Sequence, residues 1–469
     1  VTADDPRVPS LLIRSLADAD ALRMAVPQAP RDVFLAAGAP WFLTLFGRDS
    51  IWAARLLLPF GWQLAAGTLR ALAAFQGHRA DTETAEAPGK IPHELRRFGI
   101  YYGTIDATPL WICLLHDAWR WGMPEAEVAA LLPALRAALE WMRDWGDSDG
   151  DGLLEYIDDS GHGLANQGWK DSGDSVRFAD GKIAAAPVAL CEVQGYAHEA
   201  ALRGADLLSA LGAGGAGEAA RWREWAAGLA AAFRAAFWVA DATGSYPALA
   251  LDAEKRPVDS LTSNIGHLLG TGLLSRAEEA LVAGRVVAPD MDSGFGLRTM
   301  SARNGGYNPL SYHCGSVWSH DTAIVLRGLF RSGHASAATT LADGLLAAAS
   351  GFGWRLPELY SGQARADAPW PTPYPAACRP QAWSAAAAGA LVQALLGLDA
   401  DVPAGTVTLR PPGVRLSGAG VSLHVDGLVA GDETFSAGVS GCGTGYLKGC
   451  SLTQIPAGPA DTVDQAGRQ

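Results

Sequence analysis

One short stretch, residues 166–175, combines several side chains that bind or transform ligands. Its sequence is Asn-Gln-Gly-Trp-Lys-Asp-Ser-Gly-Asp-Ser. Glycine and serine let a backbone turn sharply and approach a ligand closely, so we expect a loop here. Trp169 offers a flat apolar face, and Asn166 and Gln167 offer directional hydrogen bonds. A loop that presents Asp171 in this company suits a sugar, although a surface turn with an aromatic anchor has the same composition.

A second acid, Glu358, lies in a comparable setting far downstream. It follows Pro357 and precedes Leu-Tyr-Ser-Gly, which places it in a loop beyond a predicted helix. Hydrolysis of a glycosidic bond uses two carboxyl groups, one protonated to donate to the leaving oxygen and one ionised to attack or to activate water. The chain has neither a glycine-rich phosphate loop nor a Gly-x-Ser-x-Gly motif, and its histidines lack metal-ligand spacing. The sequence therefore favours glycoside hydrolysis by Asp171 and Glu358.

One acidic segment, Asp147–Asp158, has the spacing of a calcium loop. Acids stand at its positions 1, 3, 5, 9 and 12, and glycine stands at position 6. Position 12 is Asp158, where a calcium loop usually has a bidentate glutamate, and acid-glycine turns after a helix are common. A calcium site and a plain turn therefore both remain open, and no cofactor is expected to be required.

Loops of this kind need rigid elements to hold them, and apolar residues at helical spacing recur along most of the chain. The clearest pattern runs from Val128 to Met142 and opens with Pro124, which a first helical turn tolerates. Helices are predicted over residues 8–24, 50–58, 62–77, 104–121, 124–145, 186–210, 216–239, 261–271, 274–288, 316–332, 334–350 and 380–397. Twelve helices in six hairpins indicate an all-α fold, an (α/α)6 toroid whose long loops gather at one end.

The pattern changes after residue 400. Short alternating segments near Val407, Val414 and Val421 predict strands, so residues 401–440 are expected to form a small β appendix. Residues 441–469 are rich in glycine, proline and polar side chains and are predicted to be a disordered tail. Residues 1–400 would then form the catalytic domain.

The overall composition excludes some classes of partner. The formal net charge is −13 and the pI is near 5.2, whereas a nucleic-acid partner requires a basic face. No apolar run is long enough to span a membrane. The six cysteines form no Cys-x-x-Cys pair and the first residues do not resemble a signal peptide, so we expect a soluble, cytoplasmic protein. The sequence leaves the oligomeric state open.

Several longer motifs occur in a fixed order and together resemble one family. They are Trp41-Phe42, Gly47–Ser50, Tyr102–Leu110, Asn166–Ser175, Glu192–Tyr196, Tyr307–Pro309, Trp318–Asp321 and Leu356–Glu358. From about residue 8 to about residue 400 the chain resembles the amylo-α-1,6-glucosidase family, the glucosidase half of glycogen-debranching enzymes and their bacterial relatives. The resemblance implies an (α/α)6 barrel that cleaves an α-glucosidic bond with inversion.

The resemblance also implies roles for individual residues. Asp171 would be the general acid, with Asp174 as its competitor, and Glu358 would be the general base. Arg48 and Asp49 resemble the pair that grips hydroxyl groups of the terminal glucose. The apolar platforms for the sugar ring would be Trp41, Trp169 and Trp318, and further polar contacts would come from Lys170, His320, Asp321 and Gln381.

The substrate implied first is α-1,6-linked glucose in glycogen-like polymers or in malto- and isomalto-oligosaccharides. Two alternatives stay open, namely a trehalase-like glycosidase for another disaccharide or a compatible solute, and a catalytically silent carbohydrate-binding barrel. The chain lacks the transferase barrel of eukaryotic debranching enzymes. It also begins where the β-rich domain of bacterial relatives would end, and the sequence leaves open whether it is a fragment or a short natural form.

Overall fold

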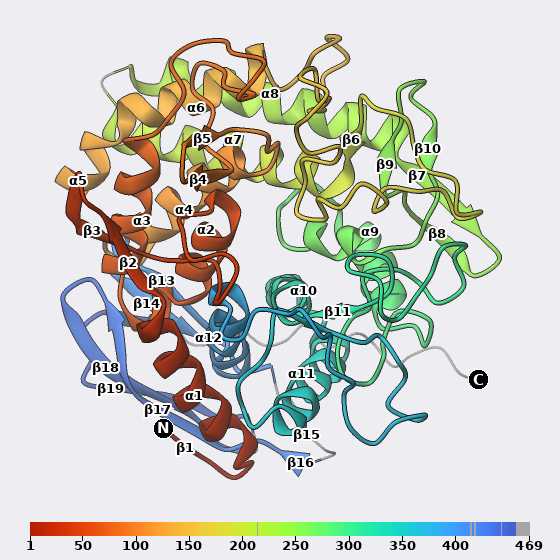
Figure 1. Ribbon diagram of the computed structural model, residues 1–469. Coiled ribbons are helices and arrows are strands. Elements are labelled where there is room, and N and C mark those ends of the chain that lie inside the picture. The colour runs from red at the N-terminus through yellow and green to blue at the C-terminus, as the bar shows by residue number, and fades with distance from the viewer. Residues whose placement is uncertain (213, 413–414, 417–418, 442, 456–469) are drawn as a thin grey trace, which may run out of the picture.

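A computed structural model of the protein describes residues 1–212, 214–412, 415–416, 419–441 and 443–455. Helices dominate it (Figure 1). The α-helices are α1 (Arg7–Ala21), α2 (Gly47–Leu56), α3 (Gln63–Ala73), α4 (Ala107–Arg120), α5 (Glu125–Ala130), α6 (Leu132–Asp144), α7 (Cys191–Leu211), α8 (Gly215–Ala236), α9 (Arg276–Val286), α10 (Ser319–Arg331), α11 (Ala335–Gly351) and α12 (Ala382–Leu396). Two 3-10 helices are η1 (Leu58–Phe60) and η2 (Ser263–Leu268).

Six of these elements form a closed inner ring. Helix α2 packs against α4, α4 against α7, α7 against η2, η2 against α10, α10 against α12, and α12 returns to α2. Small side chains allow this crowding: a Cβ at Gly389 of α12 would lie 2.3 Å from the carbonyl oxygen of Leu56 at the end of α2. Helices α1, α3, α6, α8, α9 and α11 each pack on the outside of a ring member. Each of these outer helices alternates with an inner element along the chain.

The predicted helical regions all contain helices, with two differences of form. The region 124–145 is two helices, α5 and α6, because Pro133 in the first turn of α6 has no N–H and its ring would clash with the preceding turn of a continuous helix. The region 261–271 contains only the 3-10 helix η2. It is bounded by extended backbone at Thr262 and Leu269.

Short strands accompany the helices. The hairpins are β2 (Arg23–Val26) with β3 (Ala29–Leu35), β4 (Glu94–Arg96) with β5 (Gly99–Tyr101), and β7 (Trp238–Asp241) with β8 (Gly244–Pro247). A small sheet joins β6 (Ala189–Leu190), β9 (Ala250–Leu251) and β10 (Pro257–Val258), and β11 (Val317–Trp318) pairs with β12 (Leu359–Tyr360). These pairs lie in the connections between helices, so the expectation of helices alone before residue 400 was too simple.

The C-terminal part is a β-rich unit. Its main sheet has the order β1 (Thr2–Ala3), β17 (Leu423–Ala430), β18 (Glu433–Val439) and β19 (Gly445–Lys448), so the start of the chain completes it. A second sheet joins β13 (Leu398–Asp401), β14 (Thr406–Leu409) and β20 (Thr453–Ile455), and β15 (Arg415–Leu416) pairs with β16 (Ala419–Gly420). Strands β14 to β18 lie within residues 401–440, the range expected to form the β appendix.

The expectation of a disordered tail from residue 441 is wrong for its first part. Strand β19 pairs antiparallel with β18, and β20 pairs parallel with β14. These ladders satisfy backbone groups whatever the side chains are, which is why composition alone missed them. The rest of the predicted tail, residues 456–469, lies outside the described residues.

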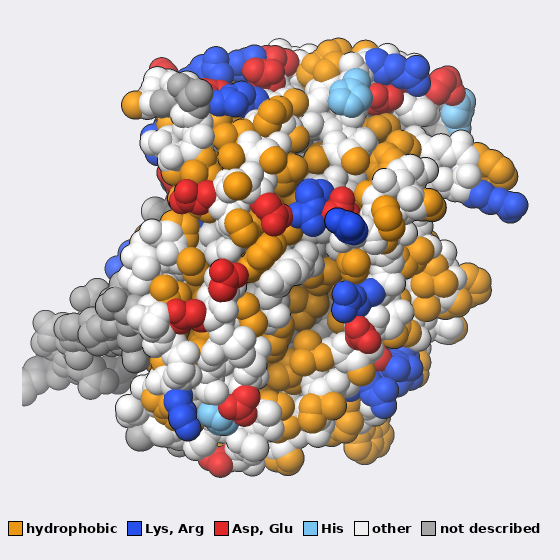
Figure 2. All heavy atoms as spheres, turned by 90° about the vertical axis from the view of Figure 1, so that its left-hand side faces the viewer, with side chains coloured by type: hydrophobic (Ala, Val, Ile, Leu, Met, Phe, Trp, Pro, Cys, Tyr) orange, Lys and Arg blue, Asp and Glu red, His pale blue; other side chains and the backbone are white. Residues whose placement is uncertain are grey.

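The outer wall of the helical part carries a cavity of about 520 Å³ between α1, the β2–β3 hairpin and the start of α3. These elements form the left side of Figure 1, which faces the viewer in Figure 2, where hydrophobic side chains line a hollow between charged patches. None of the candidate catalytic residues lines this cavity. Within the described part of the chain, no helix combines the length and apolarity needed to cross a membrane.

Candidate active site

The first residues of the inner-ring elements meet at one end of the ring. Arg48, in the first turn of α2, donates hydrogen bonds of 3.1 and 2.9 Å to the two carboxylate oxygens of Asp106. Asp106 is the residue that directly precedes α4. Glu192 in the first turn of α7 accepts a 2.9 Å hydrogen bond from Asn264 of η2. A ring that places its helix starts together also brings their connecting loops together, and these loops carry both candidate acids.

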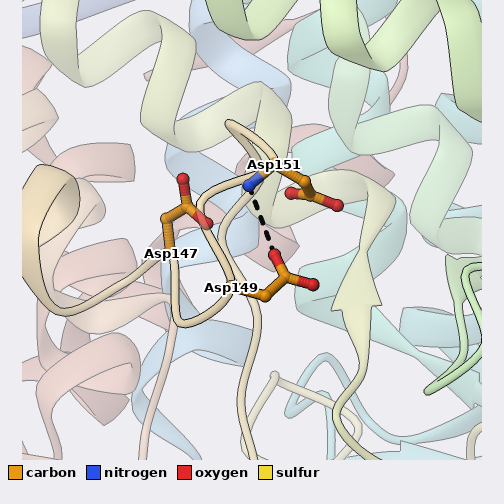
Figure 3. A group of neighbouring side chains, drawn as sticks. All are labelled: Asp147, Asp149 and Asp151. Carbon is orange, nitrogen blue, oxygen red and sulfur yellow. Dashed lines mark hydrogen bonds between the residues drawn. The ribbon is translucent and has the colours of Figure 1, made fainter.

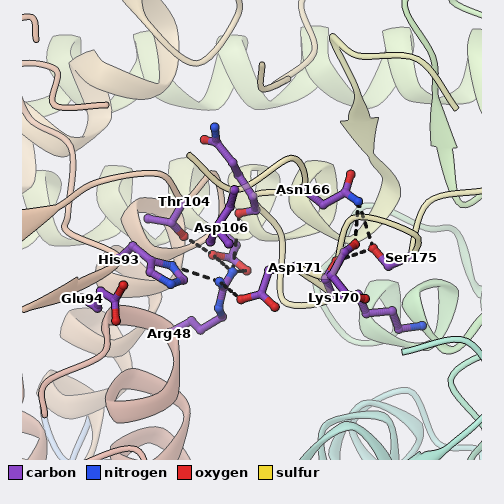
Figure 4. A network of polar contacts seen from close by, with 12 residues as sticks. Arg48, His93, Glu94, Thr104, Asp106, Asn166, Lys170, Asp171 and Ser175 are labelled. Carbon is purple, nitrogen blue, oxygen red and sulfur yellow. Dashed lines mark hydrogen bonds and ion pairs between the residues drawn. The ribbon is translucent and has the colours of Figure 1, made fainter. Parts of the chain in front are cut away.

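Arg48 is the centre of a buried polar network (Figure 4). Besides Asp106, its guanidinium contacts Oδ2 of Asp171 at 3.3 Å and Nδ1 of His93 at 3.0 Å. A guanidinium can only donate, so His93 accepts at Nδ1 and is neutral there. Burial and the charge of Arg48 lower the pKa of His93 well below its usual value, which agrees with this role. The network therefore holds the carboxyl group of Asp171 next to the guanidinium of Arg48, which Asp106 keeps in position.

Asp171 has the protonation behaviour that a general acid needs. Its side chain is 31% exposed, so a ligand can reach it. Partial burial, which disfavours the charged form, raises the pKa of Asp171 to about 6, although the positive charge of Arg48 lowers it. The competitor Asp174 behaves differently: its side chain is 50% exposed and pairs with Arg177 at 3.2 Å. The structure thus brings Asp171, and not Asp174, into the buried network.

Glu358 is held at both of its carboxylate oxygens. The hydroxyl of Tyr312 donates a 2.6 Å hydrogen bond to Oε1, and the backbone N–H of Cys378 donates a 2.9 Å hydrogen bond to Oε2. Burial raises the pKa of Glu358 above its usual value with a further increase from the charge of Asp171, and the two hydrogen bonds oppose this rise without cancelling it. The loops of Asp171 and Glu358 are far apart in the sequence but meet here, because Oγ of Ser172, next to Asp171, lies 2.8 Å from Nδ1 of His313, and Tyr312, next to His313, holds Glu358.

Asp49 is a third buried carboxyl group in this region. It follows Arg48 in the first turn of α2, which places it beside the buried network that holds Asp171. Burial raises the pKa of Asp49 to about 8, while the charge of Arg48 lowers it and the charges of Asp171 and Glu358 raise it. Asp49 is therefore protonated over most of the neutral range and can donate a hydrogen bond as well as accept one.

A cluster of aromatic side chains packs beside these acids. Trp169 and Trp318 meet edge to face with ring centroids 5.7 Å apart, and both belong to one buried group with Leu359 and Trp383. His320 stacks on Trp383 with centroids 3.6 Å apart. Trp383, in the first turn of α12, was not among the predicted site residues, although it lies two positions after the predicted Gln381. That closeness to Gln381 is the signal that could have found it.

Several buried polar atoms around this cluster have no hydrogen-bond partner within the described protein. They are both ring nitrogens of His320, Oδ2 of Asp321, Oε1 of Gln381, and the indole nitrogens of Trp169 and Trp383. Buried polar groups normally have partners, because leaving them unpaired costs free energy. These atoms are also closed off from solvent, so they lie behind the surface of the site.

Two residues predicted to contact the sugar, Lys170 and Trp41, lie outside the network around Arg48 and the aromatic cluster. Lys170 is buried, and its ammonium donates to Oδ1 of Asn264 and to the carbonyl oxygen of Thr299, each at 2.6 Å. Figure 4 shows its side chain pointing away from Asp171, so it anchors the loop of residues 166–175. Trp41 lies at the rim, 64% exposed, with its indole N–H donating to the carbonyl oxygen of Ala376 at 2.9 Å.

The chain matches one known family over more than half of its length. Residues 63–353 match the model of the mannosylglycerate hydrolase MGH1-like glycoside hydrolase domain. This family differs in name from the amylo-α-1,6-glucosidase family that the motifs resemble. Comparison with curated proteins gives no match.

Solved structures agree on the fold. The GH63 mannosylglycerate hydrolase from Thermus thermophilus in complex with glucose aligns with a TM-score of 0.60 and 15% identity, over 81% of this chain and 99% of that one. The GH78 rhamnosidase of Bacillus sp. GL1 aligns with a TM-score of 0.63 and 15% identity, over 93% of this chain. The chain spans only 40% of that rhamnosidase. From the match of the family model, the chain belongs to the MGH1-like glycoside hydrolases.

Proposed function

We propose that this glycoside hydrolase cleaves an α-glycosidic bond with inversion, with Asp171 as general acid and Glu358 as general base. One observation carries the proposal: the loops of the two acids are distant in the sequence yet meet, because Oγ of Ser172, beside Asp171, lies 2.8 Å from Nδ1 of His313, and Tyr312, beside His313, donates a hydrogen bond to Glu358. Inverting hydrolases need such a pair, one protonated and one ionised, with room for a water molecule.

The environment of each acid fits its proposed role. The pKa of Asp171 is about 6, so at a pH below that value Asp171 holds the proton that the glycosidic oxygen must receive as the bond breaks. Glu358 accepts two hydrogen bonds, which favour its ionised form and fix its orientation. Glu358 would remove a proton from a water molecule, and the resulting hydroxyl would attack the anomeric carbon from the face opposite the leaving group.

The floor of the site would bind the sugar that leaves as free product. Trp169, Trp318 and Trp383 would supply apolar surface, and the fully buried His320, Asp321 and Gln381 would support this aromatic group from behind. Arg48 is fully engaged with Asp106, Asp171 and His93, so it acts mainly on Asp171. The protonated Asp49 would take the role of a direct contact to a hydroxyl group.

The proposed substrate is a small α-glycoside in which one sugar is joined to a compact, hydroxylated partner. The name of the matching family supports this class, since it refers to mannosylglycerate hydrolysis. A second candidate is an oligosaccharide with an α-1,6-linked terminal glucose. The exposed ring of Trp41 beside the Ala376–Cys378 segment favours it, because a rim tryptophan offers a platform for a further sugar unit.

The proposal extends to the architecture. The closed ring of inner elements with alternating outer helices supports the predicted (α/α)6 toroid. Residues 1–400 would be the catalytic domain, and the strands within residues 401–440 would be the core of the β appendix, completed by β1 and β19.

The test is proton NMR of the purified protein with α-mannosyl and α-glucosyl glycerates, trehalose, maltose, isomaltose and panose. We expect the β-anomer of the released sugar to appear first, from the glycerates under the leading proposal or from isomaltose and panose under the second. First release of the α-anomer from the glycosidic unit of any substrate other than trehalose would overturn the inverting mechanism; trehalose itself should give one α-glucose and one β-glucose. Absence of cleavage across the panel, with the protein folded, would overturn both substrate classes.

A further inference from the structure

The acidic loop that resembles a calcium site gathers three carboxylates. Asp147, Asp149 and Asp151 each place an oxygen within 4.8 Å of the others (Figure 3). Asp147 accepts hydrogen bonds from the backbone N–H groups of Gly150 and Gly152. Asp149 and Asp151 each accept one backbone hydrogen bond from the loop, through Oδ1. Their Oδ2 atoms are therefore available to a cation.

That cation comes from another part of the chain. The ammonium of Lys255 lies 2.8 Å from Oδ2 of Asp149, 2.7 Å from Oδ2 of Asp151 and 2.7 Å from Oε2 of Glu155. Lys255 lies between β9 and β10 and has φ of +57°, a left-handed conformation that a side chain other than glycine rarely adopts. An ammonium has three N–H donors, and here each of them has a carboxylate partner.

The ammonium of Lys255 thus contacts acids that would be ligands of a calcium ion in such a loop. Asp149, Asp151 and Glu155 stand at positions 3, 5 and 9 of the predicted calcium loop. Asp158, at position 12, instead accepts from Ser160 and from the backbone N–H of Gly163. We propose that Lys255 replaces a divalent cation in this loop, so that the protein binds no calcium here while Lys255 is present and gains a calcium site when Lys255 is removed.

The loop also supports a helix that carries part of the candidate site. Residue Leu154 exchanges hydrogen bonds with the side chain of Gln194: its N–H donates to Oε1 at 2.9 Å, and its carbonyl oxygen accepts from Nε2 at 2.7 Å. Gln194 is in the first turn of α7, two residues after Glu192. The ammonium of Lys255 therefore stabilises a segment that braces the start of α7.

Metal and lysine compete for the same oxygens. Calcium requires six to eight oxygen ligands, and the loop can offer the carboxylates of its acids together with a backbone carbonyl oxygen. With Lys255 in place, an entering ion would have to displace an ammonium from three carboxylates and would meet its positive charge. Without Lys255, the acids repel one another and a hard divalent cation relieves that repulsion.

The test compares the chelator-treated full chain with its Lys255→Met variant, which keeps most of the length of the side chain and removes its charge. Thermal unfolding is followed in EDTA and in millimolar calcium chloride, and terbium luminescence counts bound ions. We expect the unfolding midpoint of the unsubstituted protein to be the same in both solutions. The Lys255→Met variant should unfold at a lower temperature in EDTA, recover in calcium, and bind one equivalent of terbium.

Two controls isolate the loop. Lys182→Met removes an exposed ion pair with Asp180 and should leave both measurements unchanged. Adding Asp149→Asn to Lys255→Met should abolish the calcium response. One equivalent of calcium bound by the unsubstituted protein, with a raised unfolding midpoint, would overturn the proposal. A folded Lys255→Met variant that ignores calcium would overturn it too, and if that variant does not fold, the calcium titration of the unsubstituted protein still decides.

Discussion

The hydroxyl of Tyr312 lies 2.6 Å from Oε1 of Glu358, and this contact defines the state of both groups. Burial and the charge of Glu358 raise the pKa of Tyr312, so the tyrosine keeps its proton and donates it to the hydrogen bond. The backbone N–H of Cys378 holds the other oxygen of Glu358. A carboxylate held at both oxygens has one orientation, which a base that activates a single water molecule requires.

Tyr312→Phe should therefore change the pH dependence of activity. The hydrogen bond from Tyr312 lowers the pKa of Glu358, so its loss raises that pKa. Because the proposed base must be ionised, the acidic limb of the kcat/KM profile should move to higher pH, and the maximum should fall about tenfold. Tyr374→Phe is a matched control, since its ring lies 5.8 Å from that of Tyr312. An unmoved acidic limb in Tyr312→Phe would show that this contact does not set the protonation of the base.

Asp171→Asn should abolish the transfer of a proton to the leaving group. General acid catalysis contributes about 10²- to 10⁴-fold, so kcat should fall by a factor in that range for substrates with poor leaving groups. A substrate whose leaving group needs no proton should lose much less. Asp174→Asn, which alters a half-exposed ion pair, should retain nearly full activity. Reversal of the two outcomes would assign the acid to Asp174.

The alkaline limb of the activity profile should report Asp171. Its pKa of about 6 predicts that activity falls as pH rises through that value, because the acid loses its proton. The charge of Arg48 lowers the pKa of Asp171, and salt screens this partly buried contact much less than it screens exposed charges, so high salt should shift the limb little. The measurement is kcat/KM against pH at two ionic strengths.

Arg48→Met should destabilise the folded protein. Arg48 is 3% exposed and pairs with Asp106, so its removal leaves buried carboxylates without compensation. Breaking such a buried pair costs about 3–5 kcal/mol, to be measured as the free energy of unfolding in denaturant. Arg14→Met, at an exposed position of α1, is the control and should change stability by about 0.5 kcal/mol or less. Equal stability of the two variants would contradict the role of Arg48.

Asp49→Asn should stabilise the protein at alkaline pH. The folded-state pKa of Asp49 is about 8, above the unfolded value near 3.8. The neutral carboxyl group therefore favours folding below about pH 4, and this contribution is lost as pH rises to 8. An asparagine at this position does not ionise, so the variant does not lose this contribution as the pH rises. The difference in unfolding midpoint, variant minus original, should be near zero at pH 4, grow up to pH 8 and stay constant above it.

Local patterns in the sequence predicted much of the helical scaffold. Apolar spacing located every helical region of the ring because an amphipathic pattern reflects one face buried against a neighbour. The break at Pro133 follows from the proline itself, so the sequence could have shown it, whereas the shortness of η2 depends on neighbouring elements. The strand β20 was missed for a similar reason: it is defined by pairing with β14, far away in the sequence.

The sequence by itself determined which residues are chemically able to act: the Trp169–Asp171 segment, Glu358, and the Arg48–Asp49 pair are recognisable from residue type and spacing. Only the tertiary structure decided what each of them does. It brought Tyr312 onto Glu358, turned Lys170 toward Asn264, and placed Lys255 among the acids of the predicted calcium loop. Protonation and ion binding depend on burial and on charges a few ångströms away, and the chain sets those distances only when it folds.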